Sequence, residues 1–245
     1  MNSFFSIYEA ITQGVKDESR VGSSFFGERW AAVGTDKLYG VAMSTPLESI
    51  EAVFPKGLEG LKLSDVAEAL KSWNLKEASL GLAACNAYYN SVERIEALRC
   101  AEPYENYCTT GLDMRGKTVG LVGHLHMTPQ LRSQVGKIYT LERVPQPGDY
   151  PDSACDYILP RCEVVIITGN AITNKTLPHL LELCKDAVTI LTGPSVPMCP
   201  DLLDFGIDRL AGMAVWDRVG MDARVRGGLS GNPYCHGKTF LLKKR

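Results

Sequence analysis

The second half of the chain contains a series of short, continuous apolar runs, and this pattern limits the possible folds more than any other feature. The runs are Thr118–Val122, Ile138–Leu141, Val164–Thr168, Ala187–Leu191 and Leu210–Val215. Strands of a parallel sheet have this character because both of their faces are covered. Helical patterns lie between the runs. The order of strand, helix and strand therefore predicts an α/β fold with a Rossmann-like, doubly wound, mainly parallel sheet.

The first hundred residues follow a different order, which predicts an α+β lead domain. Helical periodicity runs through residues 4–15, 64–73 and 76–90. The β-like runs Arg20–Gly34 and Lys37–Ser44 flank a turn and predict a hairpin. Small residues dominate the third helix. We expect it to pack closely against a sheet or another helix, because glycine and alanine leave room for a neighbouring backbone.

A polar stretch around Pro103 and Gly111 separates these two patterns. We place the domain boundary there, since domain boundaries fall in polar segments that contain proline and glycine. The prediction is a lead domain of residues 1–105 and a Rossmann-like domain of residues 106–245.

Charge and hydropathy exclude several classes of partner. The net charge of −2 leaves no basic surface to neutralise nucleic-acid phosphates. No apolar stretch is long enough to span a bilayer, and the first residues lack the positive charge of a signal peptide. We expect a cytoplasmic protein with neither nucleic acid nor membrane as a partner. A homodimer is left open.

Glycine and polar residues follow the apolar runs. The carboxyl ends of parallel strands form one edge of a sheet, and ligands bind at this edge where the strand order reverses. We therefore expect Gly123, Glu142, Thr168 and Gly193 to converge on one edge of a parallel sheet.

The first strand end carries two glycines and two histidines. Gly120 and Gly123 are spaced GxxG, not GxGxxG, so NAD binding is a weak interpretation. Gly123 would instead let a ligand approach the backbone. His124 and His126 share a face of an extended segment and could clamp a metal ion. The favoured alternative is that one histidine orients a ligand or a helix end while the other packs.

Glu142 ends the second strand. It lies about as far beyond Gly123 as the acid that holds a ribose hydroxyl in Rossmann folds. Its carboxylate would equally suit general acid–base catalysis, whereas a surface salt bridge with Arg143 is the plain alternative. We select Glu142 and His124 as the catalytic pair. The proline-rich loop of residues 144–151 is expected to pass over the mouth of the cleft.

The third and fourth strand ends are rich in hydroxyl and amide groups. The run TGNAITNKT can present neutral donors and acceptors to a heterocycle or a phosphate, although helix capping by a threonine is the alternative for part of it. Ser195 lacks the GxSxG context of a nucleophile, so we expect it only to shape the site. The candidate ligand-binding residues at these two ends are Thr168, Gly169, Asn170, Thr173, Asn174, Gly193, Pro194 and Ser195.

Two residues of the lead domain complete the candidate site. Asn86 is an amide in a helix of small residues, and a buried amide needs hydrogen-bond partners. We expect it to reach across the domain interface toward the ligand, with bracing of its own helix as the alternative. Glu28 follows Gly27 in the hairpin and is selected to close the site, although a solvated strand residue would look the same.

Several of these motifs together resemble the heavy-metal-chelation family, first catalogued as a domain of unknown function. The resemblance spans nearly the whole chain, and TGNAITNKT and GPSVP are its most specific parts. The motifs that carry it are Gly81–Ala87, Gly120–His124, Glu142-Arg143, Thr168–Thr176 and Gly193-Pro194-Ser195.

The resemblance implies an enolase-N-terminal-like lead domain, a Rossmann-like second domain and an active site between them. It also implies a link to metal chelation through a flavin-, pterin- or siderophore-like molecule. The leading hypothesis is an enzyme of condensation or hydrolysis that acts on such a small, polar, ring-containing molecule. The alternatives are a non-catalytic protein that binds a metal or a metal chelate, and methyl transfer from S-adenosylmethionine. No cofactor and no metal ligand is assigned.

The eight cysteines are predicted to be free thiols, mostly buried, because they are scattered and no two form CxxC. The same scatter argues against a zinc knuckle, which needs closely spaced pairs. Thiol titration of denatured, non-reduced protein should count all eight. A count lower by one disulfide pair, in protein freshly prepared without oxygen, would contradict this.

Overall fold

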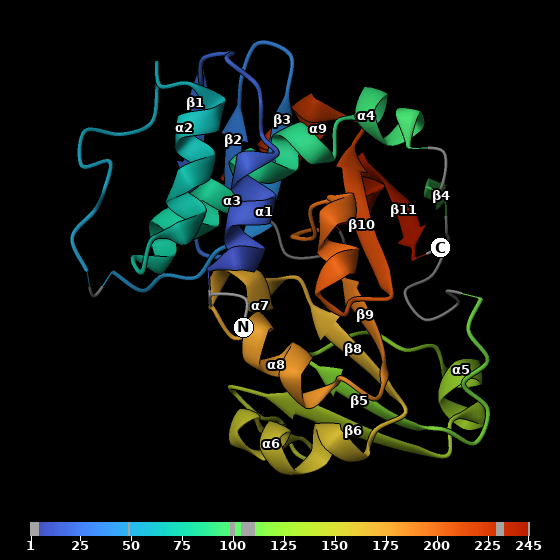
Figure 1. The fold of residues 1–245 in the computed structure, drawn as a ribbon. Coiled ribbons are helices and arrows are strands. Elements are labelled where there is room, and N and C mark those ends of the chain that lie inside the picture. Colours follow the sequence, from blue (N-terminus) through green and yellow to red (C-terminus); the bar gives the residue numbers. More distant parts are fainter. Residues whose placement is uncertain (1–4, 49, 99–100, 104–110, 229–232, 245) are drawn as a thin grey trace.

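The computed structural model describes residues 5–48, 50–98, 101–103, 111–228 and 233–244. It contains an eight-stranded sheet and a three-stranded sheet. In Figure 1 the blue and cyan N-terminal elements lie beside one end of the larger sheet, whose strands are coloured from green to red. The boundary predicted near residue 105 falls outside the described residues.

The large sheet is mainly parallel, as the apolar runs predicted. Its strand order is β4-β11-β10-β9-β8-β5-β6-β7, in which β11 is antiparallel to both neighbours and all other neighbouring pairs are parallel. The strands are β4 (Ala101–Pro103), β5 (Thr118–Val122), β6 (Lys137–Glu142), β7 (Tyr150–Pro151), β8 (Val164–Thr168), β9 (Val188–Thr192), β10 (Arg209–Val215) and β11 (Gly237–Lys243).

The helices after β5 are short. Thr128 caps α5 by accepting a hydrogen bond from the Leu131 amide, and Pro129 occupies the first turn, where its missing N–H costs nothing. The α-helices of this half are α5 (Pro129–Gln134), α6 (Cys155–Ile158), α7 (Asn170–Thr173), α8 (Leu177–Leu183) and α9 (Arg218–Arg226). The 3-10 helices are η2 (Asp152–Ala154), η3 (Leu159–Arg161), η4 (Pro200–Phe205) and η5 (Pro233–His236).

The strand order reverses between β5 and β8. From β5 the chain adds β6 and β7 on one side and then returns to place β8 on the other side. The register aligns Val122 with Leu141 and Ile167, and Thr168 with Thr192. The ends of these four strands therefore lie along one edge, which confirms the predicted convergence of the residues that follow them.

The lead unit, defined here as elements β1–β3 and α1–α4 with η1, contains the smaller sheet. Where a hairpin was predicted, the structure has three antiparallel strands, because a turn at Gly27–Arg29 divides the first β-like run. The strands are β1 (Ser23–Phe26), β2 (Trp30–Gly34) and β3 (Tyr39–Met43). The helices are α1 (Ser6–Gln13), α2 (Leu63–Ala67), η1 (Glu68–Lys71), α3 (Leu75–Tyr89) and α4 (Val92–Ala97).

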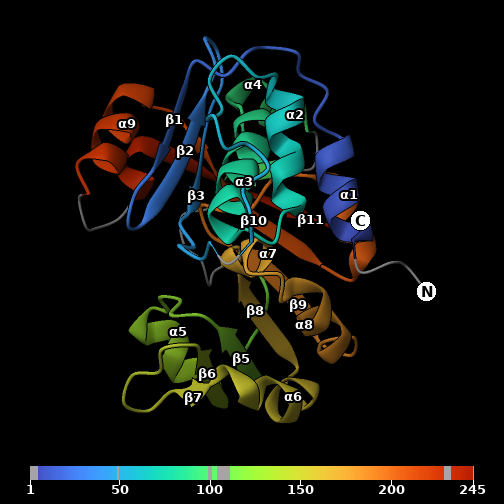
Figure 2. The ribbon, with the colours of Figure 1, turned by 90° about the vertical axis from the view of Figure 1, so that its left-hand side faces the viewer.

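Both faces of the small sheet are covered, and one cover comes from the far end of the chain. Figure 2 shows β1–β3 between α9 on one side and α3 on the other. Trp30 and Val41 pack with Met221 of α9. The Tyr39 hydroxyl donates to Asp222 of α9 at 2.9 Å, and burial together with this carboxylate raises the Tyr39 pKa.

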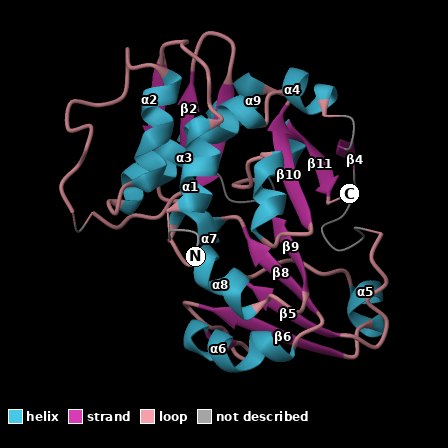
Figure 3. Cartoon of the chain, in the orientation of Figure 1, coloured by secondary structure: helices cyan, strands magenta, loops and turns pink. Residues whose placement is uncertain are grey.

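Helix α3 lies at the centre of the lead unit, and all of its residues except Lys76 are buried. Figure 3 shows it between the other helices and the small sheet. Its small residues allow close backbone contact, as predicted. A Cβ added to Gly40 of β3 would lie 2.2 Å from the Ala83 carbonyl oxygen, and one added to Gly81 would lie 2.2 Å from the Leu70 amide nitrogen.

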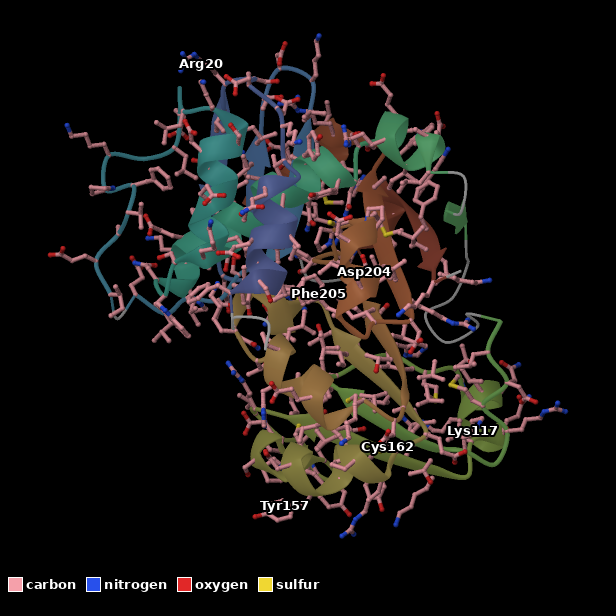
Figure 4. The ribbon with its side chains drawn as sticks, in the orientation of Figure 1. Arg20, Lys117, Tyr157, Cys162, Asp204 and Phe205 are labelled. Atoms are coloured by element: carbon pink, nitrogen blue, oxygen red, sulfur yellow. The ribbon has the colours of Figure 1, made fainter. Side chains whose placement is uncertain are left out.

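Six of the eight cysteines lie in the described residues, and all six are free thiols. Five of them are buried and Cys235 is exposed, while Cys100 and Cys108 lie outside the described residues. Figure 4 places Cys162 within the fold and Tyr157 at the outer surface, in agreement with exposed fractions of 6% and 74%. None of the helices in the described ranges has the length and apolar character needed to cross a membrane.

The close packing of α3 against η1 predicts that Gly81→Ala destabilises the protein, although alanine is the better helix former. We expect a loss of about 1–3 kcal/mol in the free energy of unfolding, because the new methyl group would overlap the backbone of η1. Denaturant unfolding measures this loss. Gly22→Ala is the matched control, since its Cβ would meet no atom closer than 3.9 Å. Equal stability of the two variants would contradict the packing.

Candidate functional site

A cleft of about 1810 Å³ lies at the carboxyl edge of the large sheet, where the strand order reverses. Loops that follow β5, β6, β8, β9 and β10 form most of its wall. The lead unit contributes Arg29, Trp30, Met43 and Glu96. The cleft is therefore shared between the lead unit and the large sheet.

Eight of the residues selected from sequence line this cleft, and five do not. The residues that line it are Gly123, His124, Glu142, Thr168, Asn170, Asn174, Gly193 and Pro194. The residues that do not line it are Glu28, Asn86, Gly169, Thr173 and Ser195.

Gly123 and Gly193 line the cleft at the ends of two strands, Gly123 partly exposed and Gly193 buried. Their φ angles are +102° and +122°, conformations that side chains rarely allow. A Cβ on Gly123 would lie 3.0 Å from the Thr168 side chain. Glycine at this position keeps open the gap between the neighbouring strands β5 and β8, so a ligand can approach the main chain there.

His124 is held between two carboxylates. Its Nε2 lies 2.5 Å from Asp149 Oδ2, and its Nδ1 lies 3.7 Å from Glu142 Oε2. The Glu142 carboxylate also accepts hydrogen bonds from the backbone amides of His124 and Arg143, at 3.0 and 2.8 Å. Both carboxylates thus fix the orientation of the imidazole, which is 40% exposed to the cleft.

Asp149 was missed by the sequence analysis, which assigned only a loop to residues 144–151. Its Oδ2 accepts from the Gln146 amide at 2.8 Å, and Gly148 turns the chain with a φ of +99°. The hydrogen bonds from His124 and Gln146 lower the pKa of Asp149. One feature of the sequence could have pointed to Asp149. It is an acid within a stiff, proline-containing loop that directly follows a candidate catalytic residue.

A second histidine–carboxylate pair lies on another part of the wall. His179 of α8 contacts Asp156 of α6 through Nε2 and Oδ1 at 2.9 Å, and both residues line the cleft. The neighbouring Cys155 also lines it, but burial raises the pKa of that thiol to about 11, so the thiolate is disfavoured. No sequence motif joins these residues, because they come from different elements.

Asn86 crosses between the two units as predicted, but its partners are backbone groups. Its Nδ2 donates to the carbonyls of Val41 in the lead unit and Pro194 beside the cleft, at 2.8 and 3.4 Å. Its Oδ1 is buried and has no hydrogen-bond partner. Asn86 thus supports the wall of the cleft from behind.

Asn90, one helical turn later, makes a fuller set of contacts. It donates to the carbonyls of Val196 and Met213 at 2.8 and 3.1 Å and accepts from the Met198 amide at 2.8 Å. Ser195 has a similar role, since its Oγ accepts from the Met43 amide at 2.8 Å. These contacts fasten the loop after β9 to the lead unit.

Three further residues selected from the sequence do not line the cleft. Gly169 packs against the 195–196 backbone, where a Cβ would approach Ser195 to 3.0 Å. Thr173 is fully buried, and its hydroxyl has no hydrogen-bond partner. Glu28 is exposed in the turn before Trp30, so the neighbouring Arg29 lines the cleft in its place.

His124 and His126 both lie at the cleft, but the geometry does not unite them into a metal centre. Within the ranges that the structure describes, no three His, Cys, Asp or Glu side chains are placed to hold a metal ion. His124 is instead engaged by Asp149.

Comparison with protein families finds a matching family for each half of the chain. The profile of the DUF364 family matches residues 110–238, and the profile of DUF4213 matches residues 8–89. Both carry the description "Putative heavy-metal chelation". The DUF364 match alone covers more than half of the 245 residues. The chain belongs to the DUF364 family.

Solved DUF364 structures share the whole fold. A protein of unknown function from Desulfitobacterium hafniense is 33% identical, with a TM-score of 0.86 over 100% of this chain and 99% of that one. A second, from Pyrococcus horikoshii, is 22% identical, with a TM-score of 0.77 over 98% and 99% of the two chains. An uncharacterized Methanocaldococcus jannaschii protein is 27% identical in an alignment 170 positions long that covers 63% of this chain and 61% of that relative.

Lys175 anchors the TGNAITNKT turn of this DUF364 chain to the lead unit. Its neighbours Asn174 and Thr176 line the cleft, whereas Lys175 is only 5% exposed and points the other way. Its ammonium group donates to the Leu70 carbonyl and lies 4.6 Å from the centre of the Tyr8 ring. The φ of +66° is uncommon for a side-chain-bearing residue.

Burial lowers the pKa of Lys175 to about 8 from its ordinary value of 10.5. Between these values the unfolded chain binds more protons than the folded one, so stability rises with pH. We expect the unfolding free energy to increase from pH 7.5 to 9.5 by about 2 kcal/mol more than in Lys175→Met. Denaturant unfolding at several pH values measures the difference. Parallel curves for the two proteins would contradict this prediction.

Proposed function

We propose that this protein is an enzyme that acts by condensation or hydrolysis on a small, polar, ring-containing molecule of the kind that chelates heavy metals. The observation that carries the proposal is the contact of 2.5 Å between His124 and Asp149 in a large cleft. A histidine oriented by a carboxylate beside a ligand cavity is the arrangement that general acid–base catalysis requires.

In this proposal the protons are placed as follows. The lowered pKa of Asp149 keeps it ionised and able only to accept, so the Nε2 of His124 carries the hydrogen of their bond. Nδ1 then has a lone pair that can take a proton from a substrate. Glu142, at 3.7 Å from Nδ1, would stabilise the resulting imidazolium.

These groups could carry out a condensation in which every atom and proton is accounted for. Nδ1 removes a proton from an amine or hydroxyl nucleophile as that group forms a bond to a carbonyl carbon. The same proton is then given to the departing hydroxyl, which leaves as water. Hydrolysis is the reverse, with water as the nucleophile. The exposed backbone at Gly123 would let the reacting group approach the strand end.

A non-catalytic carrier of a metal or a metal chelate is the competing function, and the family description fits it equally well. The donor groups at the cleft argue against direct coordination of a bare ion, because His124 is already paired with Asp149. A carrier of this design would therefore hold the metal inside a chelate.

The ligand retained by His124→Gln distinguishes the two functions. We expect mass spectrometry of small molecules released from the denatured proteins to find substrate in the variant and product in the wild type. The summed mass of the substrates and that of the products should differ by one water molecule, because loss of the acid–base group stops the reaction after binding. Asp149→Asn should show the same retention more weakly, since the imidazole then loses its orientation.

Arg161→Gln, an exposed substitution outside the cleft-lining residues, is the control and should release the same molecule as the wild type. Metal analysis of the same samples completes the experiment. Identical ligands in wild type and His124→Gln, with metal at stoichiometric amount in both, would reject the enzyme and support the carrier.

A further inference from the structure

The end of the cleft near β10 and β11 has a chemistry unlike that around His124. Trp216 follows β10 and is 54% exposed, and the ammonium group of Lys238 lies 3.0 Å from the centre of its ring. The sheet register explains the contact. Lys238 pairs with Ala214, and Trp216, two residues further along, emerges on the same face.

Two cations toward this end lack a carboxylate partner: Lys238, and Arg29, which directly precedes Trp30, whose side chain packs in one cluster with Met213 of β10. Neither Lys238 nor Arg29 of the lead unit forms an ion pair within the described part of the chain. Glu96 of α4 also lines the cleft, but it is not bonded to either of them. Positive charge facing a cavity without a counter-ion favours an anionic ligand.

The opposite end of the cleft is acidic. Glu142, Asp152 and Asp156 line it beside the histidines, and Arg143, at 3.6 Å from Asp152, is the cation among them. The cleft is thus polarised along the sheet edge. One end carries carboxylates and histidines, and the other carries two unpaired cations and an exposed indole.

The two ends are too far apart for one small group to reach both. Three inter-strand steps separate β10 from β5, which corresponds to about 14 Å. The cavity of about 1810 Å³ also exceeds the roughly 300–1,000 Å³ typical of sites for a single small ligand. A ligand that fills this cleft has two parts.

We propose that the Trp216 and Lys238 end binds a planar aromatic ring that carries an anionic group, as the second part of the ligand whose reacting group lies at His124. The ring stacks on the open face of the Trp216 indole, and Lys238 and Arg29 neutralise the anion. This assignment rests on the proposed function for its account of the His124 end, but the recognition chemistry at Trp216 is independent of it.

Naphthalene carboxylate is the probe, with neutral naphthalene carboxamide and non-aromatic cyclohexane carboxylate for comparison. Calorimetric titration of the wild-type protein should show the aromatic acid binding at least about tenfold more tightly than either analogue. Lys238→Met should remove most of the preference for the acid over the amide. Trp216→Leu should weaken both aromatic probes by about tenfold while leaving cyclohexane carboxylate unchanged.

Matched controls lie outside the cleft. Trp73 is exposed to a similar extent as Trp216, and Lys185 is an exposed cation, so Trp73→Leu and Lys185→Met should bind all three probes as the wild type does. Equal affinity of the wild type for acid and amide would overturn the proposal, as would equal losses in the controls. Unfolding temperatures of all the variants separate loss of binding from loss of folding.

The experiments separate a failure of the aromatic anion site from a failure of the proposed enzyme activity. His124→Gln should bind the naphthalene probe within about twofold of the wild type, because the probe occupies the other end. Selective probe binding together with identical ligands in wild type and His124→Gln would reject the enzyme and leave the aromatic anion site in place. Absence of selective probe binding, together with substrate in His124→Gln and product in the wild type, would reject the aromatic anion site and support the enzyme.

Discussion

Two amides on one buried helix fasten the protein together. Asn86 and Asn90, one turn apart near the end of α3, bond backbone groups of the loop that follows β9 and, through Met213, of β10 itself. Buried amides are costly unless paired, so the contacts of Asn90 on both its nitrogen and its oxygen, and those of the Asn86 nitrogen, hold the lead unit over the sheet edge. Gly40 and Gly81 allow α3 to sit deep enough for the amides to reach.

The position of the lead unit determines the shape of the cleft. The lead unit turns an open strand edge into a cavity whose far end includes Arg29 and Trp30. Lys175 holds the TGNAITNKT turn from behind, so that Asn174 faces the ligand side. The same constraint brings Arg29 of the lead unit into the wall of the cleft that Lys238 of the sheet also lines.

The position of the cleft could be predicted from the sequence, but several of the side chains that contact each other within it could not. His124 and Glu142 follow apolar strands directly, so their place at the edge could be predicted from strand order alone. Asp149 could not, because the path of its loop back to the histidine depends on turn geometry at Gly148. Ser195 was selected for the ligand, yet its hydroxyl is used by the Met43 amide.

The sequence by itself determined the parallel sheet, its order of strands and helices, and the edge where the polar residues gather, because these follow from local periodicity and from the polarity of strand ends. The tertiary structure alone decided which amides serve packing and which line the cleft, and it brought α9 from the end of the chain onto the first sheet. Those outcomes depend on contacts between residues far apart in the chain, and no local pattern encodes such distances.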